Sequence, residues 1–160
     1  MLTIRERLIP LLQRQQKHYS HNLRSSLHDH GVQLLDYQQL NNPQREWVDE
    51  YFKASIFPVL TPLAVDPAHP FPFVSNLSLN VAAVIRDPET GQQQFARVKV
   101  PQKNLPRFIA IPKEHSSSEP TPIHTAVPLE QLIAFNLEVL IPGMPVGRHD
   151  FLRVPRDADL

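Results

Sequence analysis

The segment from Ile56 to Phe73, IFPVLTPLAVDPAHPFPF, restricts the fold more than any other part of the sequence, because five prolines stand among large apolar side chains. Proline fixes its own φ angle, lacks a backbone N–H, and pushes the preceding residue towards extended geometry. We therefore expect an extended rod without helix or ladder hydrogen bonds, whose apolar side chains fill grooves of a domain surface. A polyproline ligand for a partner protein is the alternative, but this segment is too apolar to remain in water.

The composition limits the classes of function that the chain can have. Its 160 residues fit one domain or parts of two. Sixteen basic residues balance sixteen acidic ones, which argues against a sequence-independent nucleic-acid binder. Cysteine is absent, and the four glycines form no GxGxxG or P-loop pattern, so we expect neither a thiolate metal site nor a glycine-rich nucleotide cradle. Without a signal peptide or a long apolar run, the chain is predicted to be soluble.

Hydrophobic periodicity predicts an α+β fold with helices and an antiparallel hairpin in separate blocks. A long helix over residues 3–30 is expected to kink or to start late at Pro10 and to end at Gly31. The other predicted elements follow in chain order: a short strand at 32–37, a helix after Asn42-Pro43, a hairpin of 77–85 with 95–100, a strand at 108–111, a helix after Pro128 and a strand at 151–154.

The long helix has an apolar face for which the rest of the sequence offers too few partners. Leu8, Leu12, Tyr19 and Leu23 recur at three- and four-residue steps along it. We therefore expect an exposed apolar patch along this helix, and association or poor solubility as its consequence. The domain after the helix is expected to be incomplete.

Histidines are the first candidates for chemistry. His18 and His21 have a spacing that can hold a metal on a helix, but no third ligand completes a closed site, so a solvated helix surface is favoured. His69 is fixed between prolines, and Asp66 could orient its ring. Because no nucleophile accompanies this pair, a structural histidine is favoured there as well.

Two groups of basic residues are candidates for binding anions. The first lies on the returning strand of the hairpin and in the loop after it: Arg97, Lys99, Lys103 and Arg107. For this group a solvated face balanced by nearby acids is favoured. The second lies near the end of the sequence: Arg148, Arg153 and Arg156. An oxyanion contact and a solvated face both remain open for the second group, since arginine is suited to phosphate.

Several stretches resemble the long bacterial polyphosphate kinases, the ATP–polyphosphate phosphotransferases. The signature is YFKASIFPVLTPLAVDPAHPFPFVSNLSLNVAAVI, and FARVKVPQKNLPRFIAIP, VPLEQLI, LEVLIPG and FLRVPRDADL follow in the same order as in that family. The chain departs from the family at Pro155, where threonine is common, and at Ile141, where phenylalanine is common. The resemblance implies that residues 1–36 are the C-terminal helical part of the N-terminal domain, and that residues 37–160 are the first, truncated part of the head domain.

The resemblance also implies what the parent enzyme does. An ATP-binding phosphoprotein of this family transfers the terminal phosphoryl group of ATP reversibly to polyphosphate through a phosphohistidine, with magnesium. No histidine of this chain matches a catalytic one, so we expect no catalytic, cofactor-binding or metal-binding residue here, and no cofactor. The chain would serve as scaffold, pair subunits through the head domain, and wall the polyphosphate path.

The candidate polyphosphate contacts on that path are Arg148, Arg153 and Arg156. The expected partners are ATP, polyphosphate and a second subunit, without nucleic acid, in the cytoplasm or at a membrane as part of a complex. A stand-alone, non-catalytic module that binds polyphosphate or a protein is the alternative. A self-contained enzyme that uses His69 and Asp66 is the third and least favoured hypothesis.

Overall fold

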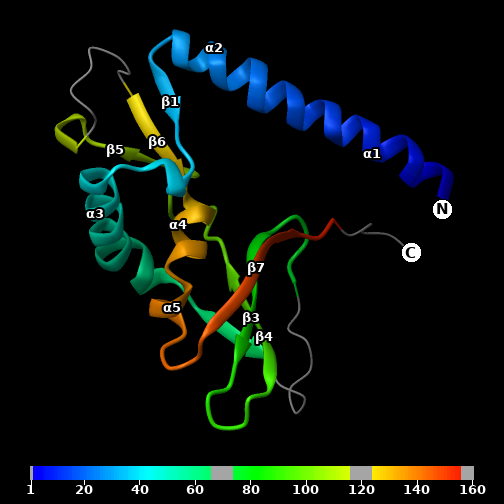
Figure 1. Cartoon of the computed structure of the whole chain (residues 1–160), viewed down its shortest axis with the longest axis vertical. Helices are drawn as coiled ribbons and strands as arrows, with labels where there is room; N and C mark the ends of the chain where they lie inside the picture. Colours follow the sequence, from blue (N-terminus) through cyan, green and yellow to red (C-terminus); the bar gives the residue numbers. More distant parts are fainter. Residues whose placement is uncertain (1, 66–73, 116–123, 156–160) are drawn as a thin grey trace.

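Two separate sheets with helices packed against them make up the computed structural model, which describes residues 2–65, 74–115 and 124–155 (Figure 1). The four-stranded sheet has the order β2-β4-β3-β7 with antiparallel neighbours, and the three-stranded sheet has the order β1-β6-β5. In the smaller sheet β1 is parallel to β6, and β5 is antiparallel to β6. The predicted α+β class is therefore confirmed.

The strands have these bounds: β1 (Val32–Leu34), β2 (Pro62–Val65), β3 (Leu79–Arg86), β4 (Gln93–Lys99), β5 (Phe108–Ile111), β6 (His124–Pro128) and β7 (Val146–Arg153). The α-helices are α1 (Leu2–Lys17), α2 (Arg24–Asp29), α3 (Asn42–Tyr51), α4 (Leu129–Phe135) and α5 (Leu137–Leu140). The π-helical turns are η1 (His18–Leu23) and η3 (Phe52–Ile56), and the 3-10 turns are η2 (Tyr37–Gln39), η4 (Phe57–Val59) and η5 (Lys113–His115).

One hydrophobic core joins the two sheets. The helices α3, α4 and α5 contribute Val48, Leu132 and Leu137 to it, and none of these side chains is more than 2% exposed. Val98 from the larger sheet and Val127 from the smaller sheet belong to the same cluster. The core therefore fixes the four-stranded sheet relative to the smaller sheet and to α3, α4 and α5, and the candidate site lies at one end of the four-stranded sheet.

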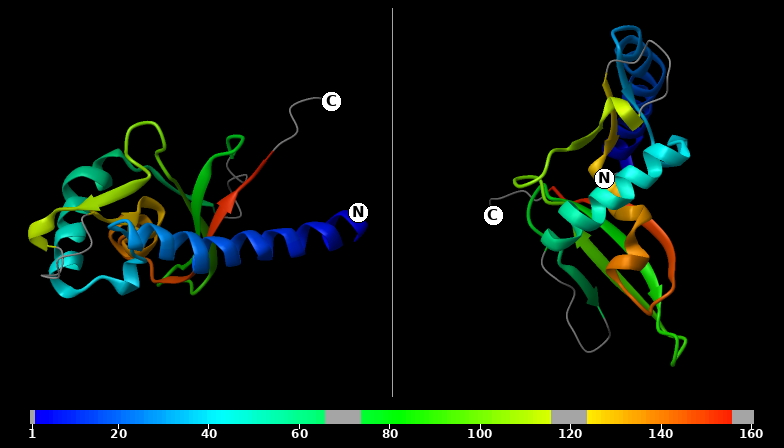
Figure 2. Two further views of the ribbon diagram at one scale, coloured as in Figure 1. Left: turned by 90° about the horizontal axis from the view of Figure 1, so that it is seen from above. Right: turned by 90° about the vertical axis from the view of Figure 1, so that its left-hand side faces the viewer.

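The first helix projects from the body of the molecule (Figures 1 and 2). Its helical hydrogen bonding continues from Leu2 through Pro10, so the predicted late start at this proline is wrong. The irregular part of the helix is the π-helical turn η1. Gly31 ends the helical run with a φ of +80°, as the sequence predicts. Within the described residues, no helix is long and apolar enough to cross a membrane.

The predicted apolar face of this helical run is exposed. Leu8 is 48% exposed, Leu12 51%, Tyr19 40% and Leu23 44%, which confirms the sequence expectation. Apolar side chains that are exposed together mark a surface on which another protein segment can pack.

The proline-rich segment forms more secondary structure than the sequence predicts. Its first part forms the 3-10 turn η4, and Pro62–Val65 pairs with β4 as the strand β2. The prediction of a rod without ladder hydrogen bonds is therefore wrong for this part. Pro62 is tolerated because it is the first residue of an edge strand, where its missing N–H need not pair. The rest of the segment, with His69 and Asp66, lies outside the described residues.

Tyr37, the first residue of η2, connects this turn to α3 and α4. Its ring is 8% exposed and stacks on Phe135, with 4.4 Å between the ring centroids. Its hydroxyl donates a hydrogen bond of 2.8 Å to Oδ1 of Asp49, and Nδ2 of Asn136 donates to the same oxygen at 3.4 Å. Burial, together with the hydrogen bond and the charge of Asp49, raises the pKa of Tyr37 to about 12.

This pKa predicts a loss of stability in alkali that depends on Tyr37. The folded pKa is raised above the ordinary value of 10.0, so the stabilisation is complete below pH 10 and is lost as the pH rises through about 12. We expect Tyr37→Phe to flatten the fall in the free energy of unfolding over this range. At neutral pH the same change should cost about 1–3 kcal/mol, because Asp49 loses its hydroxyl donor.

Urea unfolding of both proteins at several pH values measures this difference. The matched control is Tyr19→Phe on the helix surface, which should leave the pH profile unchanged. Identical alkaline profiles for Tyr37→Phe and the unsubstituted chain would contradict the prediction.

Candidate functional site: a basic pocket at one end of the sheet

A pocket of about 540 Å³ lies where β4 and β7 end and β3 begins. The strand register explains why basic residues meet there. Asn80 of β3 pairs with Lys99 of β4, and Leu79 pairs with Arg153 of β7. Lys99 and Arg153 therefore flank the start of β3 from its two neighbouring strands. Lys103 joins them from the turn that follows β4, and we call these three residues and their surroundings the basic pocket.

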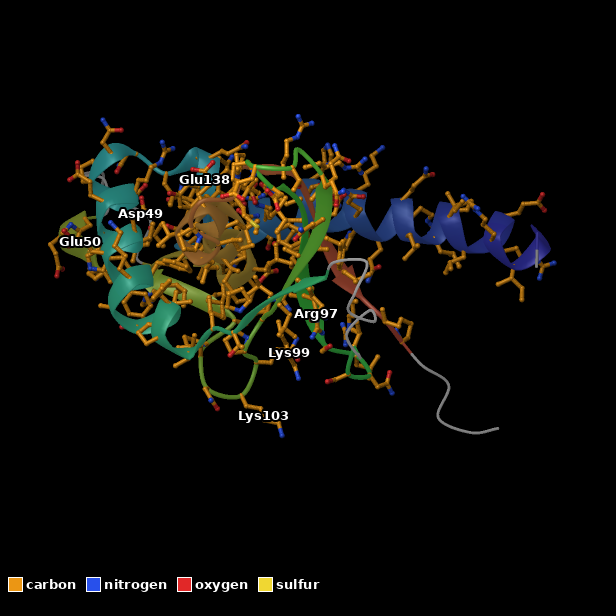
Figure 3. All side chains as sticks on the ribbon, turned by 90° about the horizontal axis from the view of Figure 1, so that it is seen from below. Asp49, Glu50, Arg97, Lys99, Lys103 and Glu138 are labelled. Carbon is orange, nitrogen blue, oxygen red and sulfur yellow. The ribbon has the colours of Figure 1, made fainter. Side chains whose placement is uncertain are left out.

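All charged side chains among the described residues that line this pocket are positive. Its neutral polar lining consists of Thr61, Ser75, Asn76, Ser78, Gln102 and Asn104. Among the described lining residues there is no aspartate, glutamate or histidine, so the three cations are not neutralised from within the pocket. Figure 3 shows Lys99 and Lys103 well apart from the acidic residues Asp49, Glu50 and Glu138. Such an arrangement concentrates positive potential and attracts anions.

The turn at residues 75–78 orients two of the cations. Nζ of Lys99 donates to Oγ of Ser75 at 3.2 Å, and Nε of Arg153 donates to the carbonyl oxygen of Leu77 at 3.2 Å. The backbone N–H of Leu77 in turn donates to the carbonyl oxygen of Val154 at 3.0 Å. The turn thus interlocks with the ends of β4 and β7 around the pocket.

Leu77 has an unusual backbone conformation for its type. Its φ is +57°, and it is the one non-glycine residue with a positive φ in the described part of the chain. A branched side chain in the left-handed region costs about 1–3 kcal/mol and persists only where its surroundings hold it. The hydrogen bonds of the turn to β7 supply such a restraint, so the pocket wall is preorganised.

The structure separates the predicted contact residues. Arg153 lines the pocket, whereas Arg148 lies five residues earlier on β7, roughly 15 Å along the strand. The side chain of Arg148 is 82% exposed and pairs with Asp150 at 2.9 Å. Arg156 lies outside the described residues. The partners of Arg153 are instead Lys99 and Lys103, for which the sequence favours a solvated face.

The other candidates do not form a site. Arg107 is neutralised by Glu130, with Nη2–Oε1 and Nε–Oε2 distances of 2.6 and 3.0 Å. His18 and His21 lie exposed on the projecting helix. No group of three metal-ligating side chains occurs among the described residues. The pocket therefore has the means to bind an anion, and its described lining offers no acidic or histidine side chain for general-base chemistry.

The fold and the pocket define a mixed α+β domain with a basic pocket at one end of its larger sheet. The family model of the polyphosphate kinase middle domain matches residues 43–160. The chain therefore belongs to the polyphosphate kinase family.

Individual relatives agree with this assignment. The chain is 74% identical over 160 residues to a polyphosphate kinase of Parasynechococcus marenigrum, and 64% identical over 160 residues to one of Prochlorococcus marinus. These matches include 100% of the chain, and the chain spans 22% of the length of each relative. The crystal structure of polyphosphate kinase from Porphyromonas gingivalis superposes with a TM-score of 0.85 at 26% identity, covering 99% of this chain and 24% of that one.

Proposed function

We propose that this chain is a non-catalytic part of a polyphosphate kinase, and that its basic pocket binds the phosphate chain. The whole protein would transfer the terminal phosphoryl group of ATP reversibly to inorganic polyphosphate. Transfer through a phosphohistidine, the use of magnesium and the pairing of subunits rest on the family resemblance alone. The division into residues 1–36 and 37–160 also remains a prediction.

The single observation that carries the role of this chain is the pocket with three cations and no acidic residue among its described lining. Polyphosphate is a linear chain with a negative charge on each unit, so it needs several cations along its path. The planar fork of Arg153 suits a pair of phosphate oxygens, and the lysines act as point charges. The hydroxyl of Ser75, which accepts from Lys99, provides a further hydrogen-bonding group at the same wall.

A salt series tests this proposal. Each phosphate contact releases condensed counterions, with a contribution of about 0.7 per contact for a single-stranded polyanion. Three contacts predict a slope of about −2 for log K against log salt, or an affinity loss of about fifteenfold between about 50 and 200 mM salt. Isothermal titration of the chain with a short linear polyphosphate of defined length measures both quantities.

Nucleotide and bare phosphate are distinguished in the same assay. We expect inorganic triphosphate and ATP to compete equally, because no aromatic side chain among the described lining residues offers a stacking surface for adenine. A slope near zero would contradict a phosphate-binding pocket. Tighter binding of ATP than of triphosphate would contradict the proposal that the pocket recognises phosphate groups without a nucleoside.

The alternative is a stand-alone binding module, and the observation that favours it is the exposed apolar face of the first helix, on which a partner protein could pack. If polyphosphate does not bind at any salt concentration, the chain acts as scaffold or as a protein-binding module instead.

A further inference from the structure

A buried arginine lies behind the basic pocket. Arg97 is 6% exposed and precedes Lys99 by two residues on β4 (Figure 3). Its Nη1 donates to Oδ1 of Asn80 at 3.1 Å, and its Nε is buried without a hydrogen-bond partner. Within the described residues no carboxylate pairs with Arg97, although the arginines 24, 107 and 148 each have one.

Such a residue is unfavourable for folding. Burying a cation removes its hydration, and the loss is offset only when a counter-charge and hydrogen bonds replace the water. An apolar side chain of similar length would fill the same space without this penalty. Among the described residues, packing alone therefore gives no reason for the charge of Arg97.

A chain of hydrogen bonds connects Arg97 to the pocket wall. Asn80 is completely buried, and its Nδ2 donates to the carbonyl oxygen and to Oγ of Ser78, at 3.0 and 3.1 Å. Oγ of Ser78 donates to the carbonyl oxygen of Ser75 at 2.8 Å. Because guanidinium can only donate, Arg97 fixes which way the amide of Asn80 points. Arg97 thereby fixes which group donates and which accepts in each hydrogen bond from Asn80 through Ser78 to Ser75, and we call this chain of hydrogen bonds the relay.

The relay ends at the residues that hold the cations. Ser75 accepts the hydrogen bond from Lys99, and Leu77, between the relay residues Ser75 and Ser78, accepts the one from Arg153. We propose that Arg97 is a positioning residue of the basic pocket, which orients the turn at 75–78 through Asn80 and adds its own buried charge to the field on the phosphate chain. This inference rests on the proposed function, and Arg97 itself does not line the pocket.

Two variants of Arg97 separate positioning from packing. Arg97→Met removes the charge and the donor but retains the length of the side chain, whereas Arg97→Lys retains the charge and one donor. We expect Arg97→Met to shift the urea midpoint only slightly, because the relief of burying a cation offsets the donor that Oδ1 of Asn80 loses. The same variant should bind linear polyphosphate about tenfold more weakly. Arg97→Lys should bind within about threefold of the unsubstituted chain.

Hydrogen exchange of the backbone amides provides a local measurement. In Arg97→Met the amide of Ser78, which donates to the carbonyl oxygen of Ser75 at 3.2 Å, should exchange faster, while amides in β5 should not change. The matched control is Arg107→Met, which changes the net charge equally but removes an arginine already neutralised by Glu130. Its affinity for polyphosphate should stay within about twofold.

The outcomes distinguish this inference from the proposed function. If the unsubstituted chain does not bind polyphosphate, the proposed function fails. If it binds and Arg97→Met binds equally well, only the positioning role is overturned. Parallel losses of stability and affinity in Arg97→Met, without rescue by Arg97→Lys, would also overturn it, because they indicate a packing role.

Discussion

Replacing Lys99, Lys103 and Arg153 together by glutamine will lower the affinity for linear polyphosphate by about a thousandfold at low salt. A charge-assisted contact to phosphate at a partly exposed site contributes about 1.4 kcal/mol, or one factor of ten. The three residues come from two strand ends and one turn, and each lines the same pocket. Glutamine retains a hydrogen-bonding group and most of the side-chain length, so the change removes charge with little loss of packing. Titration calorimetry measures the affinity, and circular dichroism checks the fold.

The control for this triple variant has the same change in net charge at other places. Lys53, Arg86 and Arg148 are exposed, and none of them lines the basic pocket. Their joint replacement by glutamine should reduce the affinity by less than about threefold, because none of them lines the pocket and only long-range attraction, which added salt screens, is lost. Equal losses in both triple variants would mean that polyphosphate responds to net charge, and would contradict a defined pocket.

The hairpin and its neighbours are predictable because their local patterns are strong. Alternation of apolar residues predicts strands over 77–85 and 95–100, and the structure has them at Leu79–Arg86 and Gln93–Lys99. The strand at 108–111 is confirmed with its predicted bounds. Gly31 takes the positive φ that ends a helix. In each case the signal lies within a few residues of the element that it specifies.

Pairings between distant segments are not predictable in this way. The strand β6 (His124–Pro128) is absent from the sequence prediction, and it pairs with both β1 and β5. Its partner β1 is about 90 residues away, and no local period specifies such a contact. The sequence does not predict the strand β2, because a proline is compatible with the first position of an edge strand but does not indicate one.

The sequence predicts only one of the three basic residues of the candidate site, Arg153. The sequence marks Arg153 as a candidate phosphate contact, but proximity along the chain groups it with Arg148 and Arg156. Its actual neighbours follow from the position of β3 between β4 and β7, which only the sheet order gives. The segment Ser75-Asn76-Leu77-Ser78 has turn chemistry in two serines and an asparagine, and this signal could have separated the turn from the following strand.

Replacing Phe52 by alanine will lower the free energy of unfolding by about 3–5 kcal/mol. Phe52 is completely buried in the core and contacts the ring of Phe57 edge-on, at 6.5 Å between the centroids. Since a domain of this size is stable by only about 5–15 kcal/mol, this loss is a large share of the total. The matched control is Phe108→Ala, because Phe108 is 43% exposed and should lose about 1 kcal/mol or less. Urea unfolding measures both, and similar losses would contradict the assigned core.

The variant Phe52→Ala also tests whether the stability of the fold and the affinity of the basic pocket change independently. Phe52 does not line the basic pocket, and it reaches the pocket only through the core cluster that it shares with Val98 of β4 and with Val100, the residue after this strand. In Phe52→Ala the apparent affinity for polyphosphate should therefore fall only by the unfolded fraction, and saturating polyphosphate should raise the unfolding midpoint by mass action. A loss of affinity in the folded fraction would mean that the core positions the pocket more directly than the contacts indicate. An unchanged midpoint with saturating polyphosphate would mean that the folded state has no preference for the anion.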